Sequence, residues 1–417
     1  MRVTLFLIDA FKDDYLSKSN TPFLYQAAKK NVHIQQIIPS AGFCERTEIF
    51  FGLRPNQSGF FTAIGFDEKN GTYKNSVLVK VFSIIEGSLE IWSRLVPKKS
   101  KKKYSIICRK ILLKFFIQLT KGKYPLKPYN IPFSFLKYFL LTEDSINWEK
   151  DKIIGNNYSL MEIVKQLGNE TYLDAFTSLG SASNGSDEDR IRRAVRSADN
   201  PLIQFIPVYI SSADSFGHRY GPNSIELSGK VNEIDTMLSK AVEAIKKTDP
   251  KMNFVYLGDH GMTEVTKKID VGSILRDVAK KRGYSKGKDY IYFLDSTIMR
   301  IWFFNENCKN ELSMELLNHP GLLKHGSVIT NEIVEEFSLP KENRKYGDLT
   351  WWGNEGVLIF PDFFYSEKPV KGMHGYKPDS RSTYGTCIIE KESELRLQIE
   401  NRYLHEVYSE IVKIMRT

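Results

Sequence analysis

The sequence has few cysteines and no long apolar run. Its 417 residues include four widely scattered cysteines, which are Cys44, Cys108, Cys308 and Cys387. Their spacing indicates neither a disulfide framework nor a zinc ribbon, so reduced thiols are expected. No stretch of about twenty apolar residues is present, which argues against a membrane-spanning helix. A small-residue cleavage site is also missing near the N-terminus, so a signal peptide is not expected and a cytoplasmic location is the default expectation.

Acidic residues are absent from one long segment, Lys98 to Lys127, which contains eleven Lys or Arg residues. The net charge of the whole chain is +9, so the positive charge is concentrated in this segment. Lys110, Lys114 and Gln118 recur there at four-residue spacing among apolar residues, a pattern that predicts a basic amphipathic helix. With the aromatic-rich run Phe133 to Leu141, residues 98–141 suit contact with an anionic membrane surface. A helix that packs its apolar face on the domain as an ordinary cap explains the pattern equally well. Nucleic acid binding is not favoured, because no nucleic-acid motif accompanies the charge.

The rest of the chain alternates strands and helices, as expected of an α/β fold with insertions. We expect a central, mostly parallel sheet flanked by helices, a basic helical insertion and a small β-rich subdomain. The expected divisions are core at 1–62, basic apolar insertion or cap at 63–155, core at 156–282, small α+β subdomain at 283–345, and core at 346–417. A final helix is predicted over 395–415.

Three apolar runs each lead to a carboxylate. Leu5 to Ile8 leads to Asp9, Leu202 to Ile210 leads to Asp214, and Phe254 to Leu257 leads to Asp259. Continuous apolar strands are typical of buried parallel sheets, whose ligands lie beyond the carboxyl ends of the strands. Histidines accompany these carboxylates: His218 follows Asp214 by four residues, His260 is next to Asp259, and His374 lies between glycines much later in the chain.

Six carboxylate and imidazole groups are enough ligands for two divalent metal ions. Two such ions can clamp a phosphoryl group and stabilise both its entering and leaving oxygens. Mixed Asp and His ligation favours zinc, with manganese and iron as alternatives. Each residue taken alone has a structural explanation, such as a helix cap, and only their joint pattern predicts a metal centre.

The segments Asp214 to Pro222, Gly258 to Met262 and Met373 to Tyr376 resemble the metal motifs of nucleotide pyrophosphatases/phosphodiesterases, in the alkaline phosphatase superfamily. Leu7 to Asp9 and Gly52 to Pro55 resemble the same family. The resemblance implies an alkaline-phosphatase-like core. It also implies two ligand sets: Asp214, His218 and His374 for one ion, and Asp9, Asp259 and His260 for the other.

The resemblance departs from the family at the nucleophile, because the family carries Thr or Ser where this sequence has Gly42. Cys44, Ser40 and Thr47 are nearby candidates to replace it. Cys44 comes first, since a helix N-terminus and an adjacent cation lower the pKa of a thiol. A small buried apolar role is the alternative for Cys44. Water activated by a metal ion is another alternative to a protein nucleophile.

Two charged residues follow Cys44. Arg46 is a candidate catalytic residue that binds a phosphate oxygen, with a surface ion pair as the alternative. Glu45, like Gly42, is placed at the substrate. The family often has Asn at the position of Glu45, and a carboxylate there would repel phosphate unless it binds a metal or is protonated.

The sequence therefore predicts a metal-dependent hydrolase of phosphate esters, with a phosphodiester as the favoured substrate. Transfer of a lipid- or glycan-linked phosphate to another acceptor is one alternative. A non-catalytic metal-binding protein on the same fold is the other, and Gly42 is the observation behind it.

Overall fold

The computed structural model describes residues 1–95, 97–147, 150–173, 185–341, 344–391 and 396–417. Its main feature is a seven-stranded sheet with the order β19-β2-β18-β9-β1-β8-β7. In that order the strands are β19 (Leu397–Tyr403), β2 (Val32–Ile38), β18 (Gly385–Glu390), β9 (Asn253–Leu257), β1 (Val3–Ile8), β8 (Ile203–Ile210) and β7 (Glu170–Thr171). β18 runs antiparallel to both neighbours, and all other neighbours are parallel. The mostly parallel α/β core predicted from the sequence is confirmed.

The three strands that lead to carboxylates lie side by side at the centre of the sheet. In the parallel register, Leu7 of β1 pairs with Tyr209 of β8 and with Leu257 of β9. Every residue of β1 and β9 is buried. Because parallel strands end at the same edge of the sheet, this register brings the residues after β1, β8 and β9 together.

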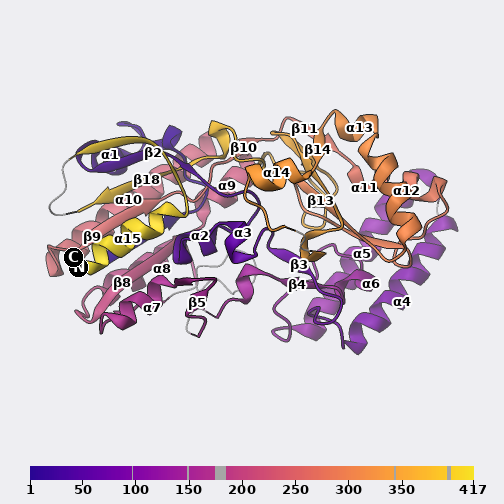
Figure 1. Cartoon of the computed structure of the whole chain (residues 1–417), viewed down its shortest axis with the longest axis horizontal. Coiled ribbons are helices and arrows are strands. Elements are labelled where there is room, and N and C mark those ends of the chain that lie inside the picture. The colour runs from indigo at the N-terminus through magenta and orange to yellow at the C-terminus, as the bar shows by residue number, and fades with distance from the viewer. Residues whose placement is uncertain (96, 148–149, 174–184, 342–343, 392–395) are drawn as a thin grey trace.

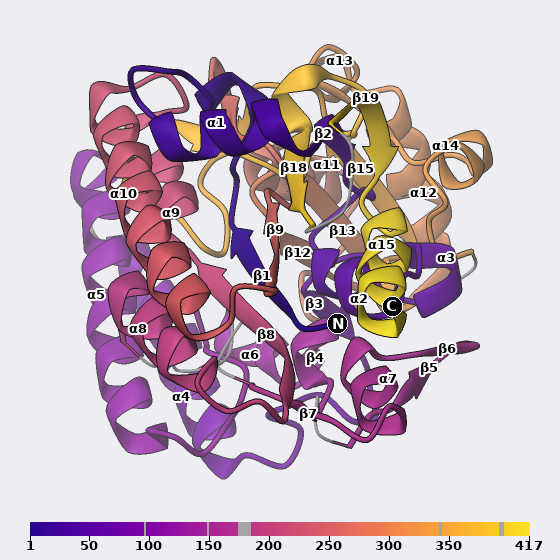
Figure 2. The ribbon, with the colours of Figure 1, turned by 90° about the vertical axis from the view of Figure 1, so that its left-hand side faces the viewer.

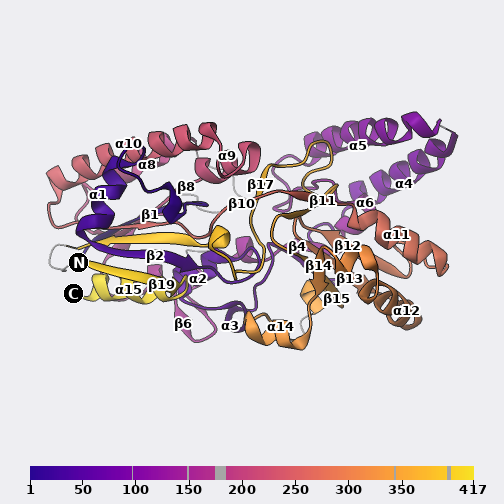
Figure 3. The ribbon, with the colours of Figure 1, turned by 90° about the horizontal axis from the view of Figure 1, so that it is seen from above.

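Helices cover both faces of this sheet (Figures 2 and 3). One face packs on α1 (Pro22–Lys30), α8 (Asp187–Ser197) and α10 (Ile225–Thr248), and the other on α2 (Glu45–Phe51), α7 (Leu160–Gln166) and α15 (Glu406–Arg416). Strand β1 shows why both faces must be covered. Phe6 and Ile8 pack with the first helix group, while Leu5 and Leu7 pack with the second. Alternate side chains of a strand point to opposite faces, so a strand with apolar side chains on both faces needs helices on both.

A second lobe lies at the other end of the molecule (Figure 1). Its antiparallel sheet has the order β12-β13-β15-β14, formed by β12 (Tyr290–Leu294), β13 (Ile298–Phe303), β15 (Leu349–Gly353) and β14 (Gly326–Val328). Around it lie α4 (Val77–Trp92), α5 (Lys98–Thr120), α6 (Phe133–Leu136), α11 (Val271–Lys281), α12 (Glu306–Leu317) and the pair β3 (Ile64–Phe66) and β4 (Phe139–Leu141). The predicted insertion and small subdomain share one apolar core.

The remaining elements are short connections, apart from α9. They are η1 (Asp13–Tyr15), α3 (Pro55–Ser58), η2 (Ser93–Leu95), η3 (Glu143–Ser145), β5 (Ile153–Ile154), β6 (Asn157–Tyr158), α9 (Ser212–Tyr220), β10 (Thr263–Glu264), β11 (Lys267–Ile269), α13 (Pro320–Leu323), α14 (Asn331–Glu336), η4 (Arg344–Tyr346), β16 (Val357–Ile359), β17 (Gly372–Met373) and η5 (Arg381–Thr383).

Three expectations need correction. The final helix begins at Glu406, because Leu397–Tyr403 forms β19 along the edge of β2. The second lobe extends beyond residue 345, since β15 pairs with β13 and β14. The aromatic run 133–141 is not a surface: Phe133, Phe135 and Phe139 are fully buried among other aromatic rings. No helix in the described ranges is long and apolar enough to span a membrane.

Candidate metal centre

The predicted ligands gather at the carboxyl edge of the central strands. Asp9 follows β1 directly, and Asp259 with His260 follows β9 after one glycine. Asp214 and His218 come from α9, which begins two residues after β8 and places them one turn apart. His374 follows β17 directly. Strand β17 pairs with β10, which begins three residues after His260, so this pairing brings His374 to Asp259 and His260. The fold thus joins residues more than 350 positions apart in one centre.

The ligand atoms form two groups that match the predicted ligand sets. The Asp214 cluster consists of Asp214, His218 and His374, and the Asp259 cluster consists of Asp9, Asp259 and His260. Within each cluster, the candidate ligand atoms lie within 4.8 Å of one another. The rings of His260 and His374 stack with their centroids 4.0 Å apart, so the two clusters are adjacent.

The Asp214 cluster presents lone pairs to a common point. Nδ1 of His218 lies 2.9 Å from the carbonyl oxygen of Gly372. A carbonyl only accepts hydrogen bonds, so Nδ1 carries a proton, and Nε2 is the nitrogen that would bind a metal ion once it is deprotonated. That Nε2 lies 3.1 Å from Oδ1 of Asp214, and Nε2 of His374 lies 3.6 Å from the same oxygen. With Nε2 of both rings deprotonated, these three atoms are facing acceptors, and this donor set fits a divalent ion.

Electrostatics differ between the two histidines of this cluster. Burial lowers the pKa of His218, but the Asp214 carboxylate outweighs this effect and raises that pKa above its ordinary value. Burial and the neighbouring His260 and His218 hold the pKa of His374 well below its ordinary value. His374 is therefore a neutral imidazole, the form that binds metal.

The carbonyl of Gly375 fixes the turn that carries His374. It accepts hydrogen bonds from Nε1 of Trp352 at 2.9 Å and from Oγ1 of Thr297 at 3.0 Å. Both donors belong to the second lobe, which therefore positions a ligand of the centre. Sequence reasoning did not find these roles, because nothing in the spacing of Trp352 or Thr297 indicates contact with residue 375.

In the Asp259 cluster, protein donors already contact the carboxylates. Oδ1 of Asp259 accepts the backbone N–H groups of Ala10 at 3.2 Å and His260 at 3.1 Å. Oδ2 of Asp259 lies 2.7 Å from Nη1 of Arg46, whose Nη2 is 3.9 Å from Oδ2 of Asp9. The Tyr209 hydroxyl donates to Oδ2 of Asp9. Nε2 of His260 lies 3.1 Å from Oδ1 of Asp9.

Arg46 therefore contacts the predicted metal ligands in this structure. It is buried, so the alternative of a surface ion pair with a neighbouring glutamate is wrong. Tyr209 was not among the predicted site residues. Its signal in the sequence is a polar-tipped ring near the end of a mostly apolar strand, one residue before the strand ends.

Gly42 has a backbone that a side chain would not fit. Its φ is +101°, and a Cβ built there would lie 1.9 Å from the carbonyl oxygen of Phe61. That oxygen accepts the N–H of Phe43 at 3.0 Å, and the ring of Phe43 lies 5.4 Å from that of His374. The structure thus uses position 42 for close backbone packing.

Cys44 is buried at the N-cap of α2, with Sγ 3.9 Å from Oγ1 of Thr142. Its thiol does not belong to the metal-ligand groups of the described residues. The next residue does: Glu45 forms a third such group with His260 and His374. Burial raises the pKa of Glu45 to about 7. The segment from 42 to 46 thus places the Glu45 carboxyl group and the Arg46 guanidinium beside the clusters.

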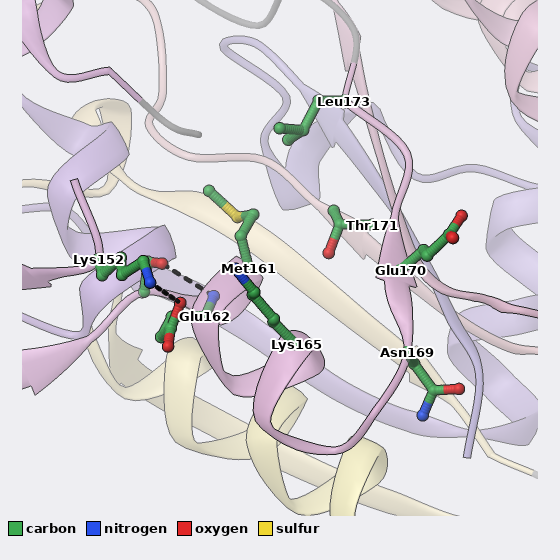
Figure 4. A pocket seen from close by; sticks show the side chains of 9 residues that line it. Lys152, Met161, Glu162, Lys165, Asn169, Glu170, Thr171 and Leu173 are labelled. Atoms are coloured by element: carbon green, nitrogen blue, oxygen red, sulfur yellow. Dashed lines mark hydrogen bonds and ion pairs between the residues drawn. The ribbon is translucent and has the colours of Figure 1, made fainter. Parts of the chain in front are cut away.

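A pocket of about 400 Å³ lies elsewhere, beside α7 and β7 (Figure 4). Its lining is mixed in charge and includes Lys152, Glu162, Lys165 and Glu170. It contains none of the predicted site residues.

Comparison with known proteins identifies the family. The type I phosphodiesterase/nucleotide pyrophosphatase family matches residues 3–377. Because this match covers most of the chain, the protein belongs to that family of hydrolases, within the alkaline phosphatase superfamily. Murine ectonucleotide pyrophosphatase/phosphodiesterase 5 shares the fold, with 17% identity and a TM-score of 0.67 over 100% of this chain and 95% of that one.

Curated relatives match over shorter stretches. An uncharacterized pyrophosphatase/phosphodiesterase of Schizosaccharomyces pombe is 24% identical over 278 residues, which are 62% of this chain and 44% of that protein. GPI ethanolamine phosphate transferase 2 of the same yeast is 33% identical over 116 residues, or 24% of this chain and 15% of the relative. The chain thus spans less than half the length of these relatives.

Proposed function

We propose that this protein is a metal-dependent hydrolase of phosphate esters, with phosphodiesters as its substrates. The observation that supports this proposal is the convergence of six carboxylate and imidazole ligands at the carboxyl edge of the central strands. Family membership supports the same reaction class. Zinc is the ion we propose, with manganese and iron as alternatives, because the donors mix oxygen and nitrogen.

A divalent ion in the Asp214 cluster would supply Lewis-acid polarisation of the phosphoryl group and lower the pKa of water. The three ligands of that cluster would hold it. Glu45 lies beside His260 and His374, where its carboxylate can accept the proton of an attacking water. Arg46 contributes a fixed positive charge next to the ligands.

The attacking group is proposed to be water. One murine relative is described as inactive when a threonine is replaced by alanine. This chain has Gly42 where the family resemblance places a hydroxyl. The predicted role of Cys44 as nucleophile stays a prediction, and the contact of its thiol with Thr142 favours water over the thiol.

Turnover of bis(p-nitrophenyl) phosphate and p-nitrophenyl phosphate by metal-loaded protein tests the proposal. Wild type should hydrolyse the diester, His374→Ala should lose this activity, and Cys44→Ala should retain it. Glu45→Gln should lower kcat while the protein still binds metal. Activity lost in Cys44→Ala, with its fold intact, would make the thiol the nucleophile. No turnover by metal-loaded wild type would favour a non-catalytic metal-binding role.

Transfer rather than hydrolysis is the second candidate, and the local similarity to GPI ethanolamine phosphate transferase 2 favours it. A transferase would move the phosphoryl-linked group to an alcohol acceptor. Adding a simple alcohol such as glycerol during diester turnover separates the two reactions. Release of nitrophenol without a glycerol phosphate product would exclude transfer to that acceptor.

We also propose that the hairpin of α4 and α5 contacts an anionic membrane surface. These helices lie at the outer end of the second lobe (Figure 3). On α5, Ile107, Ile111, Phe115 and Leu119 recur at four-residue spacing and are about half exposed. On α4, the exposed apolar side chains are Val77, Val81, Ile84, Ile85, Ile91 and Trp92. The basic charge of the 98–127 segment complements anionic lipid, and a peripheral position follows from this proposal. A cytoplasmic location stays a prediction.

Flotation with vesicles containing phosphatidylserine tests this surface. The variant Ile111→Ser with Phe115→Ser should bind less than wild type, because it removes apolar area that inserts at the interface. Ile225→Ser is the matched control, since Ile225 is an exposed isoleucine on α10, outside the hairpin. Equal flotation of the hairpin variant and wild type would contradict the proposal.

A further inference from the structure

The two clusters differ in how their carboxylates are satisfied. Within the described part of the chain, the buried Oδ1 of Asp214 faces only imidazole nitrogens, Nε2 of His218 at 3.1 Å and Nε2 of His374 at 3.6 Å, and no arginine or backbone N–H group. Both oxygens of Asp259 have donors: two backbone N–H groups on Oδ1 and the Arg46 guanidinium on Oδ2. A cation binding at Asp214 meets an open acceptor, whereas a cation at Asp259 must displace Arg46.

Contacts on several sides hold Arg46 in this position. Its guanidinium lies 4.8 Å from the centroid of the Tyr209 ring and 2.7 Å from Asp259. The hydroxyl of the same tyrosine donates to Asp9. The side chain is 6% exposed, and α2, from which it extends, is anchored by Ile49, Phe50 and Phe51 in the core. Removing the guanidinium from this place would leave a buried arginine without its carboxylate, which is costly.

We propose that the Arg46 guanidinium takes the place of the second metal ion, so that the chain holds one divalent ion, in the Asp214 cluster. This inference rests on the proposed function and replaces the two-ion expectation from the sequence. Arginine cannot lose its proton in a protein, so this positive charge is permanent. A divalent ion at Asp259 would meet it at contact distance, and like charges so close in a buried site repel strongly.

The arrangement also changes the role of Asp9 and Asp259. In place of holding an ion, they orient the guanidinium beside the neighbouring ion cluster. Arg46 is then a fixed cation that can receive a phosphate oxygen, and a guanidinium offers several N–H donors in one plane for this contact.

Metal counting tests the inference without reference to activity. Full-length protein is loaded with zinc, passed through a desalting column and analysed by mass spectrometry for ions per chain, with calorimetry as a second count. Wild type should bind one ion and Arg46→Met two. Arg54→Met is the matched control, because Arg54 also lies over a tyrosine ring, that of Tyr403, outside the centre. It should bind one ion. Circular dichroism confirms that each variant is folded, and Arg46→Gln provides a second variant if Arg46→Met fails to fold.

Asp214→Asn locates the single ion, because it should abolish binding in an otherwise wild-type chain. Two ions in wild type, or one ion in a folded Arg46→Met or Arg46→Gln, would overturn the inference and leave the proposed function standing. One ion retained by Asp214→Asn would also overturn it, since that ion would lie at Asp259. No ion in any folded variant would overturn the metal-dependent function itself.

Discussion

Restoring a hydroxyl at position 42 should damage the fold instead of creating a nucleophile. The φ of +101° at Gly42 costs a residue with a Cβ about 1–2 kcal/mol. The Cβ would lie 1.9 Å from the Phe61 carbonyl oxygen, and overpacking of this kind costs about 1–3 kcal/mol. Moving that carbonyl also weakens the hydrogen bond from the N–H of Phe43, which contributes about 1 kcal/mol. We expect Gly42→Ala to lose about 3–6 kcal/mol of unfolding free energy, and Gly42→Thr at least as much.

Urea denaturation followed by circular dichroism measures this loss. Gly283→Ala is the matched control, because Gly283 has a φ of +78° but no neighbouring atom within 4 Å of its ideal Cβ. It carries the conformational cost alone, about 1–2 kcal/mol. Diester turnover is measured in the same preparations. A Gly42→Thr protein that is as stable as Gly283→Ala, or that gains turnover over wild type, would refute this reasoning.

Three further predictions concern buried side chains in and beside the second lobe. Arg300 is fully buried and its guanidinium lies 2.9 Å from Asp295. Arg300→Met should lower the free energy of unfolding by about 3–5 kcal/mol, because it leaves the buried Asp295 carboxylate without its partner. The double variant Arg300→Met with Asp295→Asn should lose less, and urea denaturation of both variants checks this. Burial raises the pKa of Asp362 from 3.8 to about 7. The protonated side chain therefore contributes fully to stability below about pH 4, and this contribution is lost as the pH rises through about 7. The total loss in the free energy of unfolding is about 4 kcal/mol. Asp362→Asn should remove this dependence, which unfolding curves at about pH 5 and about pH 8 would show, and an unchanged pH slope would contradict it. Phe116→Ala should lower the free energy of unfolding by about 3–5 kcal/mol, because this fully buried ring of α5 packs on the rings of Phe82 and Phe133. A loss below about 1 kcal/mol in urea denaturation would mean that the hairpin of α4 and α5 is not part of the core.

The sequence predicted the core because its signals are local. The apolar runs that lead to Asp9 and Asp259 are continuous, and the run that leads to Asp214 contains one polar residue, Gln204; such strands are typical of a buried parallel sheet. The helix Asp187–Ser197 was also predictable, since Ser186 and Asp189 form a capping box at its start. By contrast, β19 pairs along the edge of β2, and most of its residues are exposed. An edge strand with little burial has no apolar pattern from which it could be predicted.

The site was predictable only in part. Ligand identities follow from residue type and position after strands, so the six ligands could be named. Their partners could not, because contacts such as those of Trp352 with Gly375 and Tyr209 with Asp9 depend on side-chain direction in the assembled fold. The aromatic run 133–141 was misread as a surface because burial against a second sheet leaves no mark on the local pattern.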